Sequence, residues 1–156
     1  MQTEENRSPR IIAPPPLIYM ALFLTGLIPQ IAFPIQFLSL PTRLILCLFL
    51  IGAGAFLVTR AFQTMRQAKT SPNPYQPAAV LVTEGPFRFT RNPVYLGMNL
   101  FYLGAGVLLN PFWSILLFPV LLLIMEFGVI HREEHYLEQR FGEDYLEYKA
   151  SVRRWL

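Results

Sequence analysis

The sequence predicts an all-α integral membrane protein with about four transmembrane helices and a C-terminal helix on the cytosolic side. Apolar residues make up 53% of the 156 residues. A soluble domain of this length would need a more polar surface than such a composition can provide. Residues 92–125 carry no charge, and a bilayer core needs roughly 20 apolar residues for each helical crossing. This run therefore predicts two crossings, which return the chain to the membrane face that it left.

The first predicted helix spans residues 15–33, and prolines mark both of its ends. The three prolines at 14–16 suit a helix entry, because proline is tolerated in the first turn. Pro34 is the predicted end, and Pro29 is expected to kink the helix. Residues 1–10 are expected to form a short disordered tail rather than a cleavable signal peptide, because the apolar run after them is longer than that of a signal.

The second predicted helix spans residues 42–62, and a long polar connection follows it. Sixteen residues separate Arg43 from Arg60, so we expect both side chains to extend to the membrane interfaces. The small residues 52–55 should allow a neighbouring helix to approach closely. The connection, residues 63–91, holds too many prolines to be helical throughout, and long loops in compact domains are often functional.

The third and fourth predicted helices span residues 92–109 and 112–130. They form an antiparallel hairpin, because only Asn110-Pro111 links them, and Pro119 is expected to bend the fourth helix. Residues 131–150 are predicted to form a helix that leaves the membrane on the cytoplasmic side and is broken or bent at Gly142.

Basic residues predict the orientation of the chain. Lysine and arginine near membrane helices stay in the cytoplasm, and cytoplasmic termini with four crossings place twelve of the 13 basic residues inside and only Arg43 outside. The net charge of +3 is explained in this way, without nucleic acid as a partner. We therefore expect a multi-pass protein of the bacterial inner membrane, or its equivalent, with both termini cytoplasmic.

Two adjacent carboxylates follow the fourth helix. Glu133 and Glu134 either belong to a solvated amphipathic helix or form a site in which one holds a cationic ligand group and the other braces a cytosolic loop. Glu126 is either an interfacial carboxylate or a functional one, and we expect it to share a helix face with Glu133, seven residues further on. His131 and His135 also share a face, but such pairs are common without metal, and we expect no metal site.

The segment before the third helix is the second candidate centre. Gly85-Pro86 predicts a turn, while Asn92 suits the N-cap and Pro93 the first helical position. A helix N-terminus carries partial positive charge and suits a carboxylate or phosphate, and Arg88 and Arg91 add full charges beside it. The arginines could equally anchor the chain to anionic lipid head groups.

These two segments carry a resemblance to a known family. The run Gly85-Pro-Phe-Arg-Phe-Thr-Arg-Asn-Pro-Val-Tyr-Leu-Gly97 resembles the Gly-Pro-(Tyr/Phe)-Arg-x-x-Arg-(His/Asn)-Pro-x-Tyr-x-Gly motif of the isoprenylcysteine carboxyl methyltransferases, which are grouped with the phospholipid N-methyltransferases. Residues 132–148 are similar to that family's Glu-Glu-x-x-Leu…Phe-Gly-x-x-Tyr-x-x-Tyr ending. The resemblance covers residues 80–156, about half of the chain, and none is evident in the first two helices.

The resemblance implies an integral membrane methyltransferase that uses S-adenosylmethionine. Its acceptor would be a lipophilic small molecule or a lipid that enters from the bilayer, and segments 78–97 and 131–156 would form a cytosolic cofactor site closed by the C-terminal segment. The residues expected to bind the cofactor are Gly85, Arg88, Arg91, Asn92, Tyr95, Gly97, Glu133, Glu134 and Tyr145. Many members have histidine where this chain has Asn92, and asparagine does not titrate near pH 7.

The chemistry of the cofactor agrees with these residues. Its ammonium group would suit Glu133 or Glu134, and its carboxylate would suit Arg91 and the N-terminus of the third helix. Its sulfonium would suit the aromatic faces of Tyr95 or Tyr145. Methyl transfer is an in-line displacement, in which positioning and the exclusion of water do most of the work.

The predicted catalytic residues are Arg91, Glu126 and Glu134. A carboxylate acceptor needs only a cation to orient it, such as Arg88 or Arg91, whereas an amine, thiol or phenol would need deprotonation assisted by Glu126 or His131. Two alternatives stay open: a membrane reductase-like protein that binds NADPH, and a membrane protein without catalytic activity.

Overall fold

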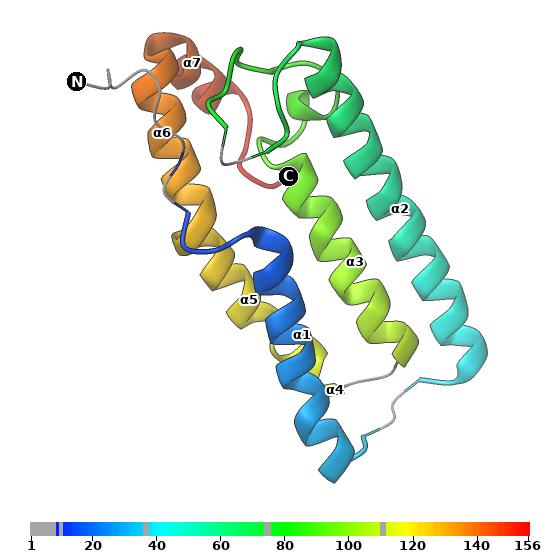
Figure 1. The fold of residues 1–156 in the computed structure, drawn as a ribbon. Coiled ribbons are helices and arrows are strands. Elements are labelled where there is room, and N and C mark those ends of the chain that lie inside the picture. Colours follow the sequence, from blue (N-terminus) through cyan, green and yellow to red (C-terminus); the bar gives the residue numbers. More distant parts are fainter. Residues whose placement is uncertain (1–8, 10, 36–37, 74–75, 110–111) are drawn as a thin grey trace.

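Every regular element of the described chain is a helix, which confirms the all-α prediction for these residues. The computed structural model describes residues 9, 11–35, 38–73, 76–109 and 112–156. The predicted link Asn110-Pro111 and most of the predicted tail lie outside them. The elements are α1 (Pro15–Ala32), α2 (Leu40–Gln67), the 3-10 turn η2 (Gly85–Arg88), α3 (Pro93–Leu109), α4 (Phe112–Leu116), α5 (Phe118–Met125), the π-helical turn η3 (Glu126–Ile130), α6 (His131–Phe141) and α7 (Glu143–Ser151). Figure 1 shows the long helices running side by side along the molecule.

Among the residues that the structure describes, two helices are long and apolar enough to cross a membrane, α1 with 18 residues and α2 with 28. Only 22% and 17% of their most apolar windows are buried inside the chain, so they are not the core helices of a soluble fold. Leu48 and Phe49 on α2, for example, are 74% and 70% exposed. Apolar surface on this scale marks contact with lipid or with another protein. The apolar helix α3 is shorter, with 17 residues.

The helix α2 is longer than the predicted span of 42–62. The apolar pattern stops near residue 60, but glutamine, arginine and methionine are good helix formers and the helix continues into the polar end. It ends in a Schellman motif. Lys69 has a φ of 55° and donates to the carbonyl of Arg66, and Thr70 donates to the carbonyl of Met65, both at 3.0 Å.

The predicted fourth helix, residues 112–130, consists of three pieces. A turn at Leu117 separates α4 from α5, because Pro119 has no N–H to donate to the preceding turn. The π turn η3 then leads directly into α6, so the path from α5 to α6 is one continuous helical rod (Figure 1). Gly142, with φ 54° and ψ −127°, separates α6 from α7 as predicted.

Glycines allow α2 and α3 to pack closely. A Cβ on Gly97 would lie 2.5 Å from Val58 Cγ2 and 3.0 Å from the Gly54 carbonyl oxygen, whereas a Cβ on Gly52 would meet nothing within 4 Å. The small residues 52–55 therefore provide the expected close helix contact, and Gly54 rather than Gly52 makes it.

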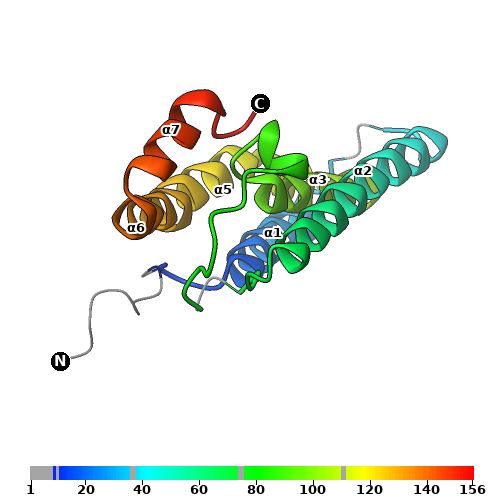
Figure 2. The ribbon, with the colours of Figure 1, turned by 90° about the horizontal axis from the view of Figure 1, so that it is seen from above.

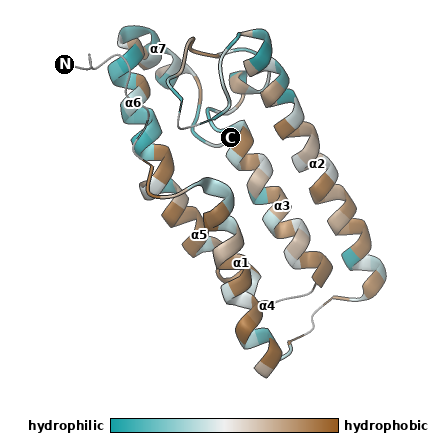
Figure 3. Cartoon of the chain, viewed as in Figure 1, coloured by the Kyte–Doolittle hydropathy of each residue, from teal (hydrophilic) through white to brown (hydrophobic). Residues whose placement is uncertain are grey.

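Hydropathy divides the molecule along its length (Figure 3). The polar end holds α6, α7, the C-terminal end of α2 and the connection between α2 and α3. Seen from above, this connection crosses the space between α2 and α6 (Figure 2). Arg43 lies at the opposite end, where its Nη1 donates to the Leu108 carbonyl at 3.2 Å and complements the negative C-terminus of α3.

Candidate functional site

The polar end contains a partly open cavity of about 320 Å³, at the small end of the range of ligand pockets, roughly 300–1,000 Å³. Its walls come from the beginning of α1, the end of α2, residues 70–73 and 76–82, η2, the beginning of α3, and α6 and α7. Most lining residues are apolar. The charged and hydrogen-bonding side chains used below are Arg91, Asn92, Tyr95, Glu133, Glu134, Tyr136, Tyr145 and Tyr148.

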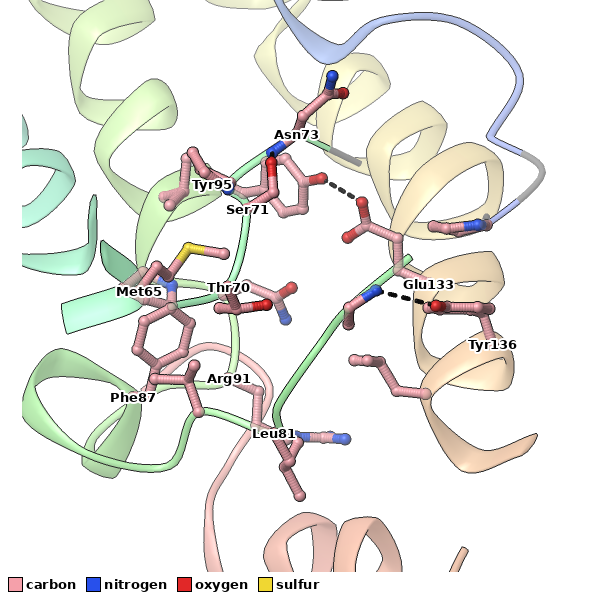
Figure 4. Close-up of a pocket in the computed structure, with 18 of the residues that line it drawn as sticks. Met65, Thr70, Ser71, Asn73, Leu81, Phe87, Arg91, Tyr95, Glu133 and Tyr136 are labelled. Atoms are coloured by element: carbon pink, nitrogen blue, oxygen red, sulfur yellow. Dashed lines mark hydrogen bonds between the residues drawn. The ribbon is translucent and has the colours of Figure 1, made fainter. Parts of the chain in front are cut away.

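Glu133 and Tyr95 meet across the cavity from α6 and α3 (Figure 4). The Tyr95 hydroxyl donates a hydrogen bond of 2.7 Å to Glu133 Oε1. Burial raises the pKa of Glu133 to about 7, the neighbouring Glu134 carboxylate adds to this effect, and the Tyr95 hydrogen bond opposes it. A cation in the cavity would favour the ionised carboxylate and lower this pKa again.

Glu134 is buried and pairs with two arginines. Arg154 donates from Nε to Oε1 at 2.9 Å and from Nη2 to Oε2 at 2.6 Å. Nη1 of Arg91 lies 2.9 Å from the same Oε1. With 7% of its side chain exposed, Glu134 is not a solvated surface charge, and it braces the segments that carry the two arginines.

Arg91 brings a buried guanidinium to the cavity wall. Its side chain is 9% exposed, and its Nε has no hydrogen-bond partner among the described residues. Buried guanidinium donors are costly when unpaired, and they bind carboxylates with short charge-assisted hydrogen bonds. The cavity therefore offers a site for an anionic group at Arg91.

Tyrosines form an aromatic wall. The ring of Tyr145, 1% exposed, packs edge-to-face on Tyr148 with 6.2 Å between centroids. The Tyr148 hydroxyl donates to the Phe87 carbonyl at 2.7 Å. Burial raises the pKa of Tyr145 to about 12, so the phenol stays neutral, while nearby Arg91 lowers the value in part.

The proline-rich connection is fixed to α6. The Ala78 N–H donates to the Tyr136 hydroxyl at 3.0 Å, and Arg140 Nε donates to the Ala78 carbonyl. The Ala79 N–H donates to Thr70 Oγ1 at 3.2 Å. These bonds explain how a segment without regular structure supplies one wall of the cavity.

The C-terminal residues 152–156, here called the C-terminal strap, bind the beginning of α3. The Arg154 carbonyl accepts from Thr90 Oγ1 at 3.0 Å and from Asn92 Nδ2 at 3.1 Å. The Arg91 N–H donates to the Arg153 carbonyl at 3.0 Å. Asn92 also starts the helix, since its carbonyl accepts from Leu96 at 2.9 Å.

Four predicted site residues do not line this cavity. Gly85, with φ 59°, lies against Thr64 of α2, and Arg88 is exposed. Gly97 lies in the α2–α3 contact described above. Glu126 pairs with Arg154 Nη1 and lies 3.8 Å from His131 Nε2.

Glu126 was expected to share a helix face with Glu133, but in the structure it shares a partner with Glu134. Arg154 joins Glu126 to Glu134, not to Glu133. The reason is the π turn at Glu126–Ile130, which widens the helix by one residue. Glu134 thereby takes the place that a regular helix would give to Glu133, and Glu133 turns toward the cavity.

Three side chains at the site were not singled out in the sequence analysis. Tyr148 is the last tyrosine of the quoted C-terminal motif, so that motif was the signal for it, whereas Tyr136 falls on an unspecified position of the motif. Arg154 was counted only as a basic residue that sets orientation, and no local pattern distinguishes it from Arg153.

The fold and the site define a helical protein with membrane-length apolar helices and a polar-end cavity that offers a carboxylate, a guanidinium and tyrosine rings. The model of the family described as "Phospholipid methyltransferase" matches residues 42–144, more than half of the chain. The chain belongs to the phospholipid methyltransferase family, which confirms the resemblance found in its motifs.

Curated relatives match a shorter stretch. The chain is 38% identical over 73 residues to the "Protein-S-isoprenylcysteine O-methyltransferase" of Schizosaccharomyces pombe, covering 47% of this chain and 31% of the relative. It is 41% identical over 73 residues to "Protein-S-isoprenylcysteine O-methyltransferase B" of Arabidopsis thaliana, covering 46% and 36%. An uncharacterized protein of Haemophilus influenzae is 49% identical over 37 residues, covering 24% and 59%. The chain thus spans about a third of the length of the first two relatives. No solved structure matches it significantly.

Proposed function

We propose that this protein transfers a methyl group from S-adenosylmethionine to a hydrophobic acceptor that partitions into the membrane. The observation that carries the proposal is the pair of opposite charges in one cavity, the Glu133 carboxylate and the Arg91 guanidinium. Together they complement the ammonium and the carboxylate at the amino-acid end of the cofactor. Membership of the family and the names of the relatives support the same activity.

The residues fit the cofactor in three respects. Glu133 would hold the ammonium group, and the guanidinium of Arg91, which lines the same cavity, would bind the carboxylate. The rings of Tyr95 and Tyr145 offer faces for the sulfonium. When bound, S-adenosylmethionine supplies an electrophilic methyl group, which an acceptor nucleophile takes as the carbon–sulfur bond breaks and its electron pair stays on sulfur.

The protein's own contribution is orientation and the exclusion of water. The apolar walls of the cavity, the bound connection at Ala78 and the C-terminal strap serve this role. Glu126 and His131 are absent from the lining, so proton removal by either one lacks support from the geometry. A carboxylate acceptor, which needs no base, agrees best with a cavity that neither group lines.

The proposal includes four membrane crossings with both termini on the cytoplasmic side. At 1.5 Å per residue, α3 spans about 26 Å and residues 112–130 about 28 Å, both close to the roughly 30 Å of a bilayer core. Arg43 lies at the apolar end while the basic residues of α6, α7 and the strap lie at the polar end. This distribution supports a cytoplasmic polar end.

Binding experiments separate this function from its alternatives. Purified protein in detergent is titrated calorimetrically with S-adenosylhomocysteine and, separately, with NADPH. Binding of S-adenosylhomocysteine alone supports methyl transfer, binding of NADPH supports a reductase-like protein, and binding of neither supports a role without catalysis.

A transfer experiment then identifies the acceptor. Radiolabelled S-adenosylmethionine is incubated with the protein and a total membrane lipid extract, and the labelled product is identified by mass. Release of labelled methanol by mild base would identify a methyl ester, as a carboxylate acceptor requires. The Glu133→Gln variant is the control: any label that it transfers to lipid does not depend on the carboxylate of the cavity.

A further inference from the structure

We propose that Arg154 is a positioning residue of the cavity, which holds Glu134 so that Arg91 keeps its donors available for the ligand's carboxylate. This inference rests on the proposed function, because it takes the ligand to have the amino-acid end of S-adenosylmethionine. Arg154 lies in the strap at the end of the chain and is not among the cavity-lining residues, so it would act through other residues.

The first step of the argument is the geometry at Glu134. Arg154 binds both of its oxygens, Oε1 at 2.9 Å and Oε2 at 2.6 Å. Arg91 reaches only Oε1, through Nη1 at 2.9 Å. A bidentate arginine fixes the plane of a carboxylate, so Arg154 sets the orientation in which Glu134 meets Arg91.

The second step is competition for Arg91. With Arg154 present, one carboxylate is shared between two guanidiniums, and Nε of Arg91 stays unpartnered among the described residues. Without Arg154, the buried Glu134 would have Arg91 as its remaining cationic partner and would turn to satisfy both of its oxygens there. Arg91 would then be held by Glu134 in place of the ligand.

The third step is the main chain around Arg91. Its N–H donates to the Arg153 carbonyl, and the flanking Thr90 and Asn92 side chains donate to the Arg154 carbonyl. The Arg154 side chain is held at a second point by Glu126, so this side chain ties the strap to the helical rod of η3 and α6. Both the backbone and the side chain of Arg91 therefore depend on Arg154.

A double-mutant cycle tests this dependence. Arg154→Gln and Arg91→Gln are made singly and together, and affinity for S-adenosylhomocysteine is measured by calorimetry. Arg153→Gln is the matched control, since it removes the same charge from the neighbouring, exposed side chain. We expect Arg154→Gln to weaken binding by about 10-fold, within the range of coupling between contacting residues, and Arg153→Gln to leave it unchanged. In the Arg91→Gln background, Arg154→Gln should cause no further loss.

Hydrogen exchange of the ligand-free protein gives a second readout. The Arg91 amide, which donates to the Arg153 carbonyl, should exchange faster in Arg154→Gln than in Arg153→Gln. Equal affinities of these two variants, additive losses in the cycle, or unchanged exchange at Arg91 would each overturn the inference. Failure of the wild-type protein to bind S-adenosylhomocysteine would instead overturn the proposed function.

Discussion

The hydroxyl of Tyr95 donates a 2.7 Å hydrogen bond to the carboxylate of Glu133 and so joins α3 to α6 across the cavity. The two residues are 38 positions apart: Tyr95 lies at the beginning of the apolar run that predicted a helical hairpin, and Glu133 follows the end of that run. Their contact shows that the arginine-bearing segment before α3 and the acidic pair after the hairpin meet at one end of the molecule.

Ligand binding should depend on pH through Glu133. Because the pKa of Glu133 is raised to about 7, the carboxylate takes up a proton as the pH falls through that value and no longer attracts an ammonium group. If only the ionised form binds, affinity for S-adenosylhomocysteine at pH 6 should be about 10-fold weaker than at pH 8. Calorimetry at both pH values checks this. Glu133→Gln should bind weakly at both, and a variant that keeps the wild-type pH dependence would contradict the assignment.

The ionisation of Glu133 should also make the stability of the protein depend on pH. Between the ordinary pKa of 4.5 and about 7, the folded state keeps a proton on Glu133 that the unfolded state has released. The unfolding temperature of the ligand-free protein should therefore fall as the pH rises through this window. In Glu133→Gln this fall in unfolding temperature should be absent. The difference between the pH dependence of the wild-type protein and that of the variant therefore measures the contribution of Glu133.

Tyr95→Phe should shift the pH dependence upward. Loss of the hydroxyl removes the hydrogen bond that lowers the pKa of Glu133, so the proton is held to a higher pH. We expect the midpoint of the binding–pH profile to rise while the profile keeps its shape. Tyr102→Phe is the control, since its hydroxyl donates to the Ser114 carbonyl at 2.6 Å, far along the chain from Glu133. A midpoint that moves equally in both variants would exclude a specific role for Tyr95.

Neutralising Glu134 should lower the stability of the protein, whereas neutralising Glu133 should not. Glu134→Gln leaves Arg91 and Arg154 without their shared counter-ion, and breaking such a buried network costs about 3 kcal/mol. Glu133→Gln removes a carboxylate that burial already disfavours and should not lower stability. Melting temperatures and yields of the two variants measure the contrast. Equal stability of both would show that Glu134 does not brace the strap.

A side chain at position 97 should destabilise the contact between α2 and α3. Gly97→Ala places a Cβ 2.5 Å from Val58 Cγ2, and such overpacking costs about 1–3 kcal/mol. Gly52→Ala, on the same pair of helices but facing open space, should leave the melting temperature unchanged or slightly raised. Adding Val58→Ala to Gly97→Ala should restore part of the loss. A Gly97→Ala protein as stable as Gly52→Ala would show that the helices are not packed as described.

Local signals in the sequence were sufficient for most helix boundaries. Prolines at 14–16 and 93 start α1 and α3, and Gly142 separates α6 from α7, because these residues restrict or free the backbone whatever surrounds them. The apolar pattern alone ended α2 too early. A helix is stabilised by its own hydrogen bonds and by residues such as glutamine and arginine, so it does not stop where the membrane-length run stops.

By itself, the sequence determined that the chain is helical, that the two motif segments lie on either side of an apolar hairpin, and that both would reach the same end of the molecule. Only the tertiary structure decided which partners Glu133 and Glu134 each contact. Side chains of adjacent helical residues point about 100° apart, and the π turn at Glu126–Ile130 shifts every later residue around the axis. Glu133 therefore turns to the cavity and Glu134 to Arg154, a partner 20 residues away that no local pattern identifies.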